Sequence, residues 1–307
     1  MVADSVLDWL LTRDVSVQFQ ATRDVLGTEV ESLRSRIATE GEGAAILAAR
    51  GPDGHWGRGF YLPYWTSTHY TLLELRELGL ASDNPRAREA VDMILKTQKS
   101  RDGGLDPNPR ARHSDVCING MALNYCSYFG AGTASLESVA DMILAQHMSD
   151  GGFNCSSNRA GARHSSVHTT LSVFEGITSY RRAGHLHRLD DLLEARNSSL
   201  DFLLRHRLYR SERTGEAIRP EFTELHHPAR WRYDILRCLD ALADARVAHD
   251  DRMDDAIEVI RSRRRSDGRW PAARGYRGET HVRYPRAGTP NGWVTLRALR
   301  VLATYGR

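Results

Sequence analysis

Two near-copies of one heptapeptide carry the residues best suited to metal chemistry. Residues 111–117 read ARHSDVC and residues 162–168 read ARHSSVH, so Cys117 and His168 occupy equivalent positions. If adjacent repeats share one architecture, these side chains face a common axis, with Asp115 two residues from the thiol. Zinc accepts a carboxylate, a thiolate and an imidazole as ligands, and three protein ligands leave a fourth position open. The pattern predicts a catalytic zinc site formed by Asp115, Cys117 and His168.

This site requires the start of a helix. Residues two apart point about 200° away from each other on a continuous helix, so Asp115 and Cys117 converge only where a helix begins. Ser114 or Asp115 is suited to cap such a helix. A first-turn cysteine faces the positive end of the helix dipole, which favours the thiolate. The alternative is that Cys117 and His168 are buried packing residues, as most single cysteines and histidines in helices are.

Two further side chains are candidates for a fourth ligand. They are His69, on the preceding inner helix, and Cys155, in the glycine-rich loop at residues 151–155. Either would close the coordination sphere, which is typical of structural zinc. Cys155 is alternatively an exposed thiol without a ligand role. Cys126 and Cys238 lie within helical patterns and are expected to be small core residues.

Pairs of helices must position these residues. Asp-Gly turns begin at residues 53, 102, 150 and 267, with a weaker Thr-Gly at 214, which indicates a repeat architecture. Between the turns the apolar spacing is helical, and strand-like alternation is almost absent. We expect helices near residues 4–12, 15–26, 29–49, 66–79, 85–98, 115–130, 135–147, 166–183, 188–207, 228–245, 251–264 and 290–304. Six helix pairs favour an all-α fold, an (α/α)6 toroid of six inner and six outer helices in a single domain over residues 1–307, with an open solenoid as the alternative.

Alignment of the inner helices predicts a tier of side chains around the cavity of this toroid. The aligned residues are Phe19, His69, Cys117, His168, Tyr233 and Trp293. The aromatic members, Phe19, Tyr233 and Trp293, would bound an apolar substrate and stabilise a developing carbocation. Ordinary core packing is the alternative for all three, because aromatic residues at helical spacing usually pack.

Composition excludes several classes of protein. The 307-residue chain has 41% hydrophobic residues and 42 basic against 39 acidic residues, for a net charge of +3. This balance gives no argument for a nucleic-acid partner. No apolar run approaches the ~20 residues needed to span a bilayer, and the N-terminus lacks a signal-peptide pattern. We expect a cytoplasmic protein without a membrane span, with its four cysteines reduced.

The motifs resemble those of a known superfamily. Asp115-Val116-Cys117 and His168-Thr169 are similar to the zinc-binding segments of protein prenyltransferase β subunits, members of the α/α toroid superfamily that includes squalene-hopene cyclases. The resemblance implies that Asp115, Cys117 and His168 bind catalytic zinc. It also implies that Arg112, and approximately Arg110, grip an isoprenoid diphosphate. The loops at residues 150–153 and 267–270 are similar to those of the cyclases.

Three departures from these families narrow the function. The acidic Asp-x-Asp-Asp motif of the cyclases is missing, and the acidic pairs at residues 250–251 and 254–255 belong to an outer helix pattern. Ile118 stands where the prenyltransferases have an aromatic residue. Nothing in the sequence supplies their helical partner subunit. Farnesylation of a peptide is therefore not expected.

Three functions follow from these observations. The first is a zinc-dependent, prenyltransferase-like enzyme that activates a thiol or water to act on a small apolar substrate such as an isoprenoid diphosphate. The second is a metal-independent terpenoid cyclase-like enzyme, for which Asp234 and Glu224 are the nominated acids. The third is a non-enzymatic toroid with structural zinc. The histidines His226 and His227, next to Pro228, are expected at a cavity rim before an inner helix.

Overall fold

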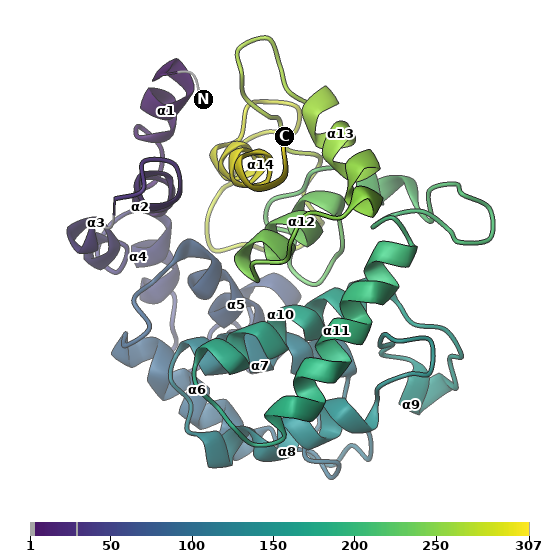
Figure 1. The fold of residues 1–307 in the computed structure, drawn as a ribbon. Coiled ribbons are helices and arrows are strands. Elements are labelled where there is room, and N and C mark those ends of the chain that lie inside the picture. The colour runs from purple at the N-terminus through teal and green to yellow at the C-terminus, as the bar shows by residue number, and fades with distance from the viewer. Residues whose placement is uncertain (1–3, 29, 307) are drawn as a thin grey trace. The chain divides into compact units, whose positions relative to one another are not determined.

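The computed structural model describes residues 4–28 and 30–306, and over these residues the fold is all-α (Figure 1). Besides helices, they contain three isolated bridges, Lys99–Leu105, Arg210–Ala217 and Pro271–Pro290, and no strand. The predicted all-α class is confirmed. Within the same residues, no helix combines the length and apolar character needed to cross a bilayer.

The helices follow one another along the whole described chain. Their bounds are α1 Asp4–Leu10, α2 Val15–Asp24, α3 Glu31–Arg36, α4 Gly41–Ala48, α5 Thr68–Leu78, α6 Pro85–Thr97, α7 Val116–Tyr128, α8 Thr133–Ala145, α9 Ser157–Ala160, α10 Val167–Arg182, α11 Leu189–Arg205, α12 Ile235–Asp244, α13 Asp254–Ser262 and α14 Gly292–Tyr305. Short 3-10 turns are η1 Tyr64–Thr66, η2 Pro220–Thr223 and η3 Asp251–Met253.

Most predicted helices are present, and the differences lie at their boundaries and in the short helix α9, which no predicted range covers. The helix expected at 29–49 is divided into α3 and α4, and its residue 29 lies outside the described residues. The helix expected from residue 228 begins at Ile235, because Asp234 caps it through a hydrogen bond from the Arg237 N–H (2.8 Å). Pro228 therefore lies in the preceding loop and not in a first helical turn.

The chain forms two compact units, each built from segments distant in sequence. Unit 1 comprises the described residues up to 48, residues 77–81 and those from 204 onward. Unit 2 comprises residues 49–76 and 82–203. The single domain and the closure of the helix pairs into one ring stay predictions.

In unit 2, helices α7 and α10 pack with their backbones nearly in contact. A Cβ atom at Gly176 would lie 2.4 Å from the Gly120 carbonyl oxygen. A Cβ atom at Gly120 would lie 2.8 Å from the Ser172 carbonyl oxygen. Only glycine allows this approach, which sets the spacing between the two helices.

The Asp-Gly turns fix where helices α7 and α10 of unit 2 begin. Asp102 accepts hydrogen bonds from the Ser114 N–H (2.7 Å) and hydroxyl (3.0 Å), and Asp150 accepts from the Ser165 N–H (2.7 Å) and hydroxyl (2.5 Å). Burial alone would raise the pKa of both carboxyls. The hydrogen bonds that they accept, among them those from Ser114 and Ser165, instead lower the pKa below the usual 3.8. The duplicated heptapeptides thus have the same structural role, and Cys117 and His168 are equivalent in position.

A second repeated hydrogen bond corrects the alignment of the predicted tier. Side chains near the starts of α5, α7, α10 and α14 accept backbone N–H groups of the turns: Thr68 from Trp56 (3.0 Å), Asn119 from Leu105 (2.6 Å), Thr170 from Phe153 (3.0 Å) and Thr295 from Trp270 (3.0 Å). The positions two residues earlier are Thr66, Cys117, His168 and Trp293. His69 therefore lies three residues beyond the equivalent position, because the alignment matches the Thr-Leu step at residues 71–72 and not the residue that contacts the turn.

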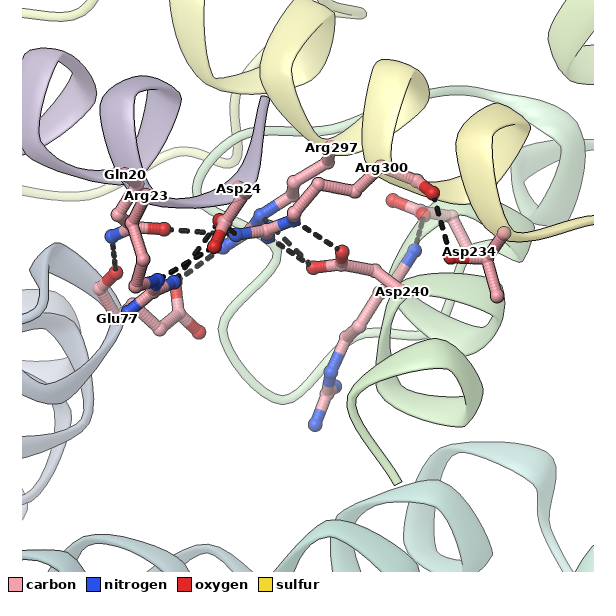
Figure 2. A network of polar contacts seen from close by, with 10 residues as sticks. Gln20, Arg23, Asp24, Glu77, Asp234, Asp240, Arg297 and Arg300 are labelled. Atoms are coloured by element: carbon pink, nitrogen blue, oxygen red, sulfur yellow. Dashed lines mark hydrogen bonds and ion pairs between the residues drawn. The ribbon is translucent and has the colours of Figure 1, made fainter. Parts of the chain in front are cut away.

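In unit 1, a network of buried and half-buried charged side chains joins α2, α12 and α14 (Figure 2). Arg300 donates two hydrogen bonds to Asp240 (2.9 and 2.7 Å) and one to Asp24 (2.8 Å), and Arg297 donates to Glu77 (3.1 Å). Burial opposes the charge of Arg300, but Asp240 and Asp24 raise its pKa above the usual value. The network balances its own charges within unit 1.

Candidate metal centre

Asp115, Cys117 and Cys155 form a cluster in unit 2 with the donor atoms of a metal site. One carboxylate oxygen and two sulfurs all lie within 4.8 Å of one another, and the three side chains are half-buried. In a tetrahedral zinc site, bonds of ~2.0–2.3 Å place the ligand atoms roughly 3.3–3.8 Å apart, so small side-chain rotations would suffice. Two sulfurs and one oxygen suit zinc. The residues fit the ion.

The start of α7 supplies two of these donors. Asp115 is the N-cap residue of α7 in extended backbone (φ −71°, ψ 122°), and its side chain makes no capping hydrogen bond. Cys117 is the second residue of the helix. The side chains of Asp115 and Cys117 therefore converge at the start of a helix, as predicted.

Cys155 reaches the cluster from the loop between α8 and α9. Its sulfur accepts the Cys117 N–H (3.1 Å) and lies 3.3 Å from the Thr169 hydroxyl. Its own N–H donates to the same hydroxyl (3.3 Å). The first turn of α10 thus holds Cys155 beside Cys117.

The crowded donors change the expected ionisation of Cys117. The hydrogen bond with Cys155, then burial, then the neighbouring charges of Cys155 and Asp115 raise the pKa of the Cys117 thiol well above its usual 9.0. The N–H of Ile118 at the helix start lowers it, but by less. The stabilisation of a thiolate that the helix dipole predicts is therefore outweighed, first by the hydrogen bond with Cys155 and by burial, and then by the neighbouring negative charges. A bound cation would reverse this balance, because it stabilises the charged forms of its ligands.

His168 and His69 lie outside this cluster. His168 is the second residue of α10, next to the Thr169 that holds Cys155, and its role as a ligand stays a prediction. His69 is fully buried, and its Nδ1 lies 3.0 Å from the Tyr125 hydroxyl. Burial lowers the pKa of His69 to about 3, so the ring is neutral.

Tyr61 is a neighbour of the cluster that sequence reasoning missed. Its hydroxyl lies 3.0 Å from that of Tyr70, and its ring contacts the His69 ring at 5.5 Å. Burial, and in smaller measure the nearby Cys117 and Asp115, raise the pKa of Tyr61, so the phenol keeps its proton. The run of aromatic residues from 60 to 70 was the available signal.

The predicted substrate-binding residues occupy different environments. Arg110 and Arg112 are exposed on the loop before α7, and neither guanidinium forms a hydrogen bond or ion pair with the described part of the chain. In unit 1, Phe19 packs against Gly79, and the Tyr233 hydroxyl donates to a backbone carbonyl in the interior. Trp293 lines a cavity of unit 1.

The two carboxylates nominated as acids meet at one histidine of unit 1. His226 Nδ1 lies 3.4 Å from Asp234, and its Nε2 lies 3.5 Å from Glu224. Asp234 is buried, Glu224 is half-exposed, and the ring of Tyr276 stacks on that of His226 at 4.8 Å. Asp234 also accepts the N–H of His226 (3.1 Å), besides capping α12.

Comparisons with known proteins yield a structural likeness only. No family model and no curated protein matches the chain. Matching solved structures include the apo type II terpene cyclase MstE from Scytonema, with a TM-score of 0.36 and 12% identity over 88% of this chain and 97% of that one. A variant of the same cyclase, in complex with its substrate geranylgeranyl dihydroxybenzoate, matches with a TM-score of 0.37 and 13% identity over 88% and 96% of the two chains. Such a distant likeness identifies no substrate, metal or catalytic residue of this chain.

Proposed function

We propose that this chain is a zinc-dependent enzyme of prenyltransferase-like type, in which Asp115, Cys117 and Cys155 hold the ion. The observation that carries the proposal is the convergence of one carboxylate oxygen and two sulfurs within 4.8 Å. Zinc bound by three protein ligands would lower the pKa of a thiol or water in its open position. The predicted site thus keeps Asp115 and Cys117 and gains Cys155, and the fourth position stays open to substrate unless His168, the other predicted ligand, occupies it.

The neighbouring side chains support action on an apolar substrate with an anionic group. The phenol of Tyr61 stays protonated and would donate a hydrogen bond near the reacting atoms. Leu62 and Tyr64, in the same loop, each expose 56% of their surface, which suits an apolar contact. Arg110 and Arg112 would bind a diphosphate, because guanidinium groups pair with phosphate oxygens in two-pronged geometry.

Metal content tests the ligand set. Purified protein should contain close to one zinc per chain, and Cys117→Ser, Cys155→Ser and Asp115→Asn should each reduce it severalfold. Cys126→Ala, which removes a buried thiol of the same helix α7, should leave it unchanged. If His168→Ala loses as much zinc as Cys117→Ser, His168 is a ligand as well. Full zinc in both cysteine variants would refute the site.

Turnover tests the enzyme. The zinc-loaded protein is incubated with an isoprenoid diphosphate and a small thiol, and diphosphate release is followed. We expect release that depends on zinc and is lost in Cys117→Ser, whereas Arg112→Ala should raise KM more than it lowers kcat. Equal release with and without zinc would exclude zinc-dependent transfer. A cobalt-substituted protein with two thiolate ligands and no exchangeable position would indicate structural metal.

The contacts of His226 favour a second candidate, a metal-independent terpenoid cyclase-like enzyme. A histidine between a buried and a half-exposed carboxylate can pass a proton from solvent towards an apolar substrate. Cyclisation of an isoprenoid that persists in the presence of a chelator, and that His226→Phe abolishes, would select this candidate. Cyclisation unaffected by His226→Phe would remove it.

A further inference from the structure

A cavity of about 480 Å³ in unit 1 has a lining unlike that of the cysteine cluster. Its walls include two rings, two guanidinium groups and two carboxylates, from Tyr284, Trp293, Arg13, Arg283, Asp14 and Glu42. Cavities of roughly 300–1,000 Å³ hold small organic molecules. The arrangement of these groups decides which kind of molecule fits.

The N-terminus of α14 forms part of the cavity wall. Asn291, Gly292 and Trp293 line the cavity, and the Asn291 side chain caps the 14-residue helix by accepting the Val294 N–H (3.0 Å). The first-turn N–H groups of Gly292 and Trp293 have no partner within the helix and carry partial positive charge. This end of the cavity suits an anion.

Some charged side chains of the cavity lining already accept hydrogen bonds from the protein, whereas Arg283 makes none with the described residues. Asp14 accepts the N–H of Ser16 (2.9 Å) and that of Glu42 (2.8 Å), and the Glu42 carboxylate accepts the Trp293 indole N–H (3.3 Å). Arg283 is exposed and, among the residues that the structure describes, makes no hydrogen bond or ion pair. Its guanidinium is therefore available to a ligand.

A buried histidine beside the cavity supplies an independent observation. The His227 ring is only 6% exposed, stacks on Trp293 (centroids 5.2 Å, 21°) and meets Tyr284 edge-on (5.5 Å, 86°). Neither of its ring nitrogens has a hydrogen-bond partner among the described residues. A buried polar group without a partner costs about 1–3 kcal/mol, so such groups are uncommon away from functional sites. Here the group adjoins both aromatic walls of the cavity.

We propose that this cavity binds a small organic acid with a single negative charge. Its carboxylate would lie between Arg283 and the N-terminus of α14, and its flat apolar body would pack against Trp293 and Tyr284. The charge is limited to one because Asp14 and Glu42, in the same lining, repel a dianion such as a phosphate monoester. The site is independent of zinc, so its failure would leave the metal centre untouched.

Isothermal titration with 2-naphthoate tests the site, with neutral 2-naphthamide and dianionic 2-naphthyl phosphate as matched ligands. We expect 2-naphthoate to bind to the full chain and the other two to bind at least roughly tenfold more weakly, the difference expected for losing a charge-assisted hydrogen bond. Equal binding of the amide would overturn the proposal, because apolar contact alone would then explain the affinity. Absence of binding by 2-naphthoate would overturn it as well.

Two arginine variants distinguish specific binding at this site from a general effect of positive surface charge. Arg283→Ala should weaken 2-naphthoate roughly tenfold to hundredfold. Arg286→Ala removes another exposed arginine of the same segment, one that does not line the cavity, and should leave the affinity unchanged. Because both side chains are exposed, neither variant should unfold the protein. Equal losses in the two variants, or no loss in Arg283→Ala, would contradict the proposal.

Discussion

Two groups of polar side chains, one in each unit, differ in how their charges are balanced. In unit 1, Arg300 lies between Asp24 and Asp240 within hydrogen-bonding distance of both (Figure 2), and the pKa of Asp24 is lowered: burial opposes this, but Arg23 and Arg300 outweigh it. In unit 2, the cluster of Asp115, Cys117 and Cys155 brings one carboxylate and two thiols together, and the pKa of Cys117 is raised. In the first group, positive and negative side chains already neutralise one another and hold helices together. The second group would be stabilised by a bound cation. Burial of polar groups alone therefore does not indicate a functional site. What indicates one is that the clustered groups raise one another's pKa and so oppose ionisation.

Removal of the central cation of unit 1 should have the largest effect on stability. Arg300→Met leaves Asp24 and Asp240 without their shared partner, so we expect the free energy of unfolding to fall by about 3 kcal/mol. Urea unfolding followed by circular dichroism measures it. Arg252→Met breaks the more exposed pair with Asp250 and should change little. A loss of the same size in both variants would show that the network does not hold the helices together.

Zinc should stabilise the protein through unit 2 alone. At about 100 times its Kd, a ligand that binds only the folded state adds about 2.7 kcal/mol, and a chelator should remove that increment. The increment should vanish in Cys117→Ser and persist in Arg300→Met. Thermal unfolding with and without zinc distinguishes these cases. An increment that survives in Cys117→Ser would place the metal elsewhere.

Acid should weaken the scaffold of unit 2 through the Asp-Gly turns. The folded-state pKa of Asp150 lies below 3.8, so its contribution is fully present above that pH and is lost as the pH falls through the folded value. We expect Asp150→Asn to cost about 1 kcal/mol near neutral pH and almost nothing in strong acid. Urea unfolding at several pH values measures the difference.

Asp267→Asn is the matched control for this change. Asp267 occupies the corresponding turn of unit 1, where it is exposed and accepts the N–H of Arg269 (3.0 Å). We expect a smaller cost near neutral pH, because this carboxylate is exposed. A cost for Asp150→Asn that does not vary with pH would show that its hydrogen bonds to Ser165 are not charge-dependent.

The smallest expected effect separates metal binding from substrate handling. Tyr61→Phe removes the hydroxyl that lies 3.0 Å from Tyr70 and should change stability by less than about 1 kcal/mol. Zinc content should stay the same while turnover falls, because the phenol is expected to act on the substrate. Tyr64→Phe, on an exposed ring of the same loop, should leave both unchanged. Loss of zinc in Tyr61→Phe would instead make the tyrosine a support of the metal ligands.

Sequence reasoning recovered the parts of this molecule that depend on local periodicity. The helical hairpins, the Asp-Gly turns and the equivalence of Cys117 and His168 all follow from spacing along the chain, and all are present. Selection of the third donor depends on a tertiary contact, because Thr169 of α10 holds Cys155 beside α7. No local pattern ranks Cys155 above His168 as the neighbour of Cys117.

The ionisation of Cys117 and the position of His69 likewise depend on tertiary contacts that local sequence patterns do not reveal. The helix dipole predicts a thiolate, but the contribution of Cys155 becomes visible only when the loop is placed. His69 was aligned by residue type, whereas the hydrogen bond of Thr68 to the preceding turn sets the register. The aromatic loop containing Tyr61 was not used because its neighbours are distant in sequence.

The contact between Gly120 and Gly176 has a consequence for genetics. Neither residue belongs to the cluster, yet any side chain at either position would push apart the helices that carry Cys117 and Thr169. A random-mutagenesis screen for loss of zinc should therefore return these glycines alongside the ligands themselves. Second-site suppressors of such mutants should be substitutions to smaller residues on the facing helix. None should arise in the loop of Cys155.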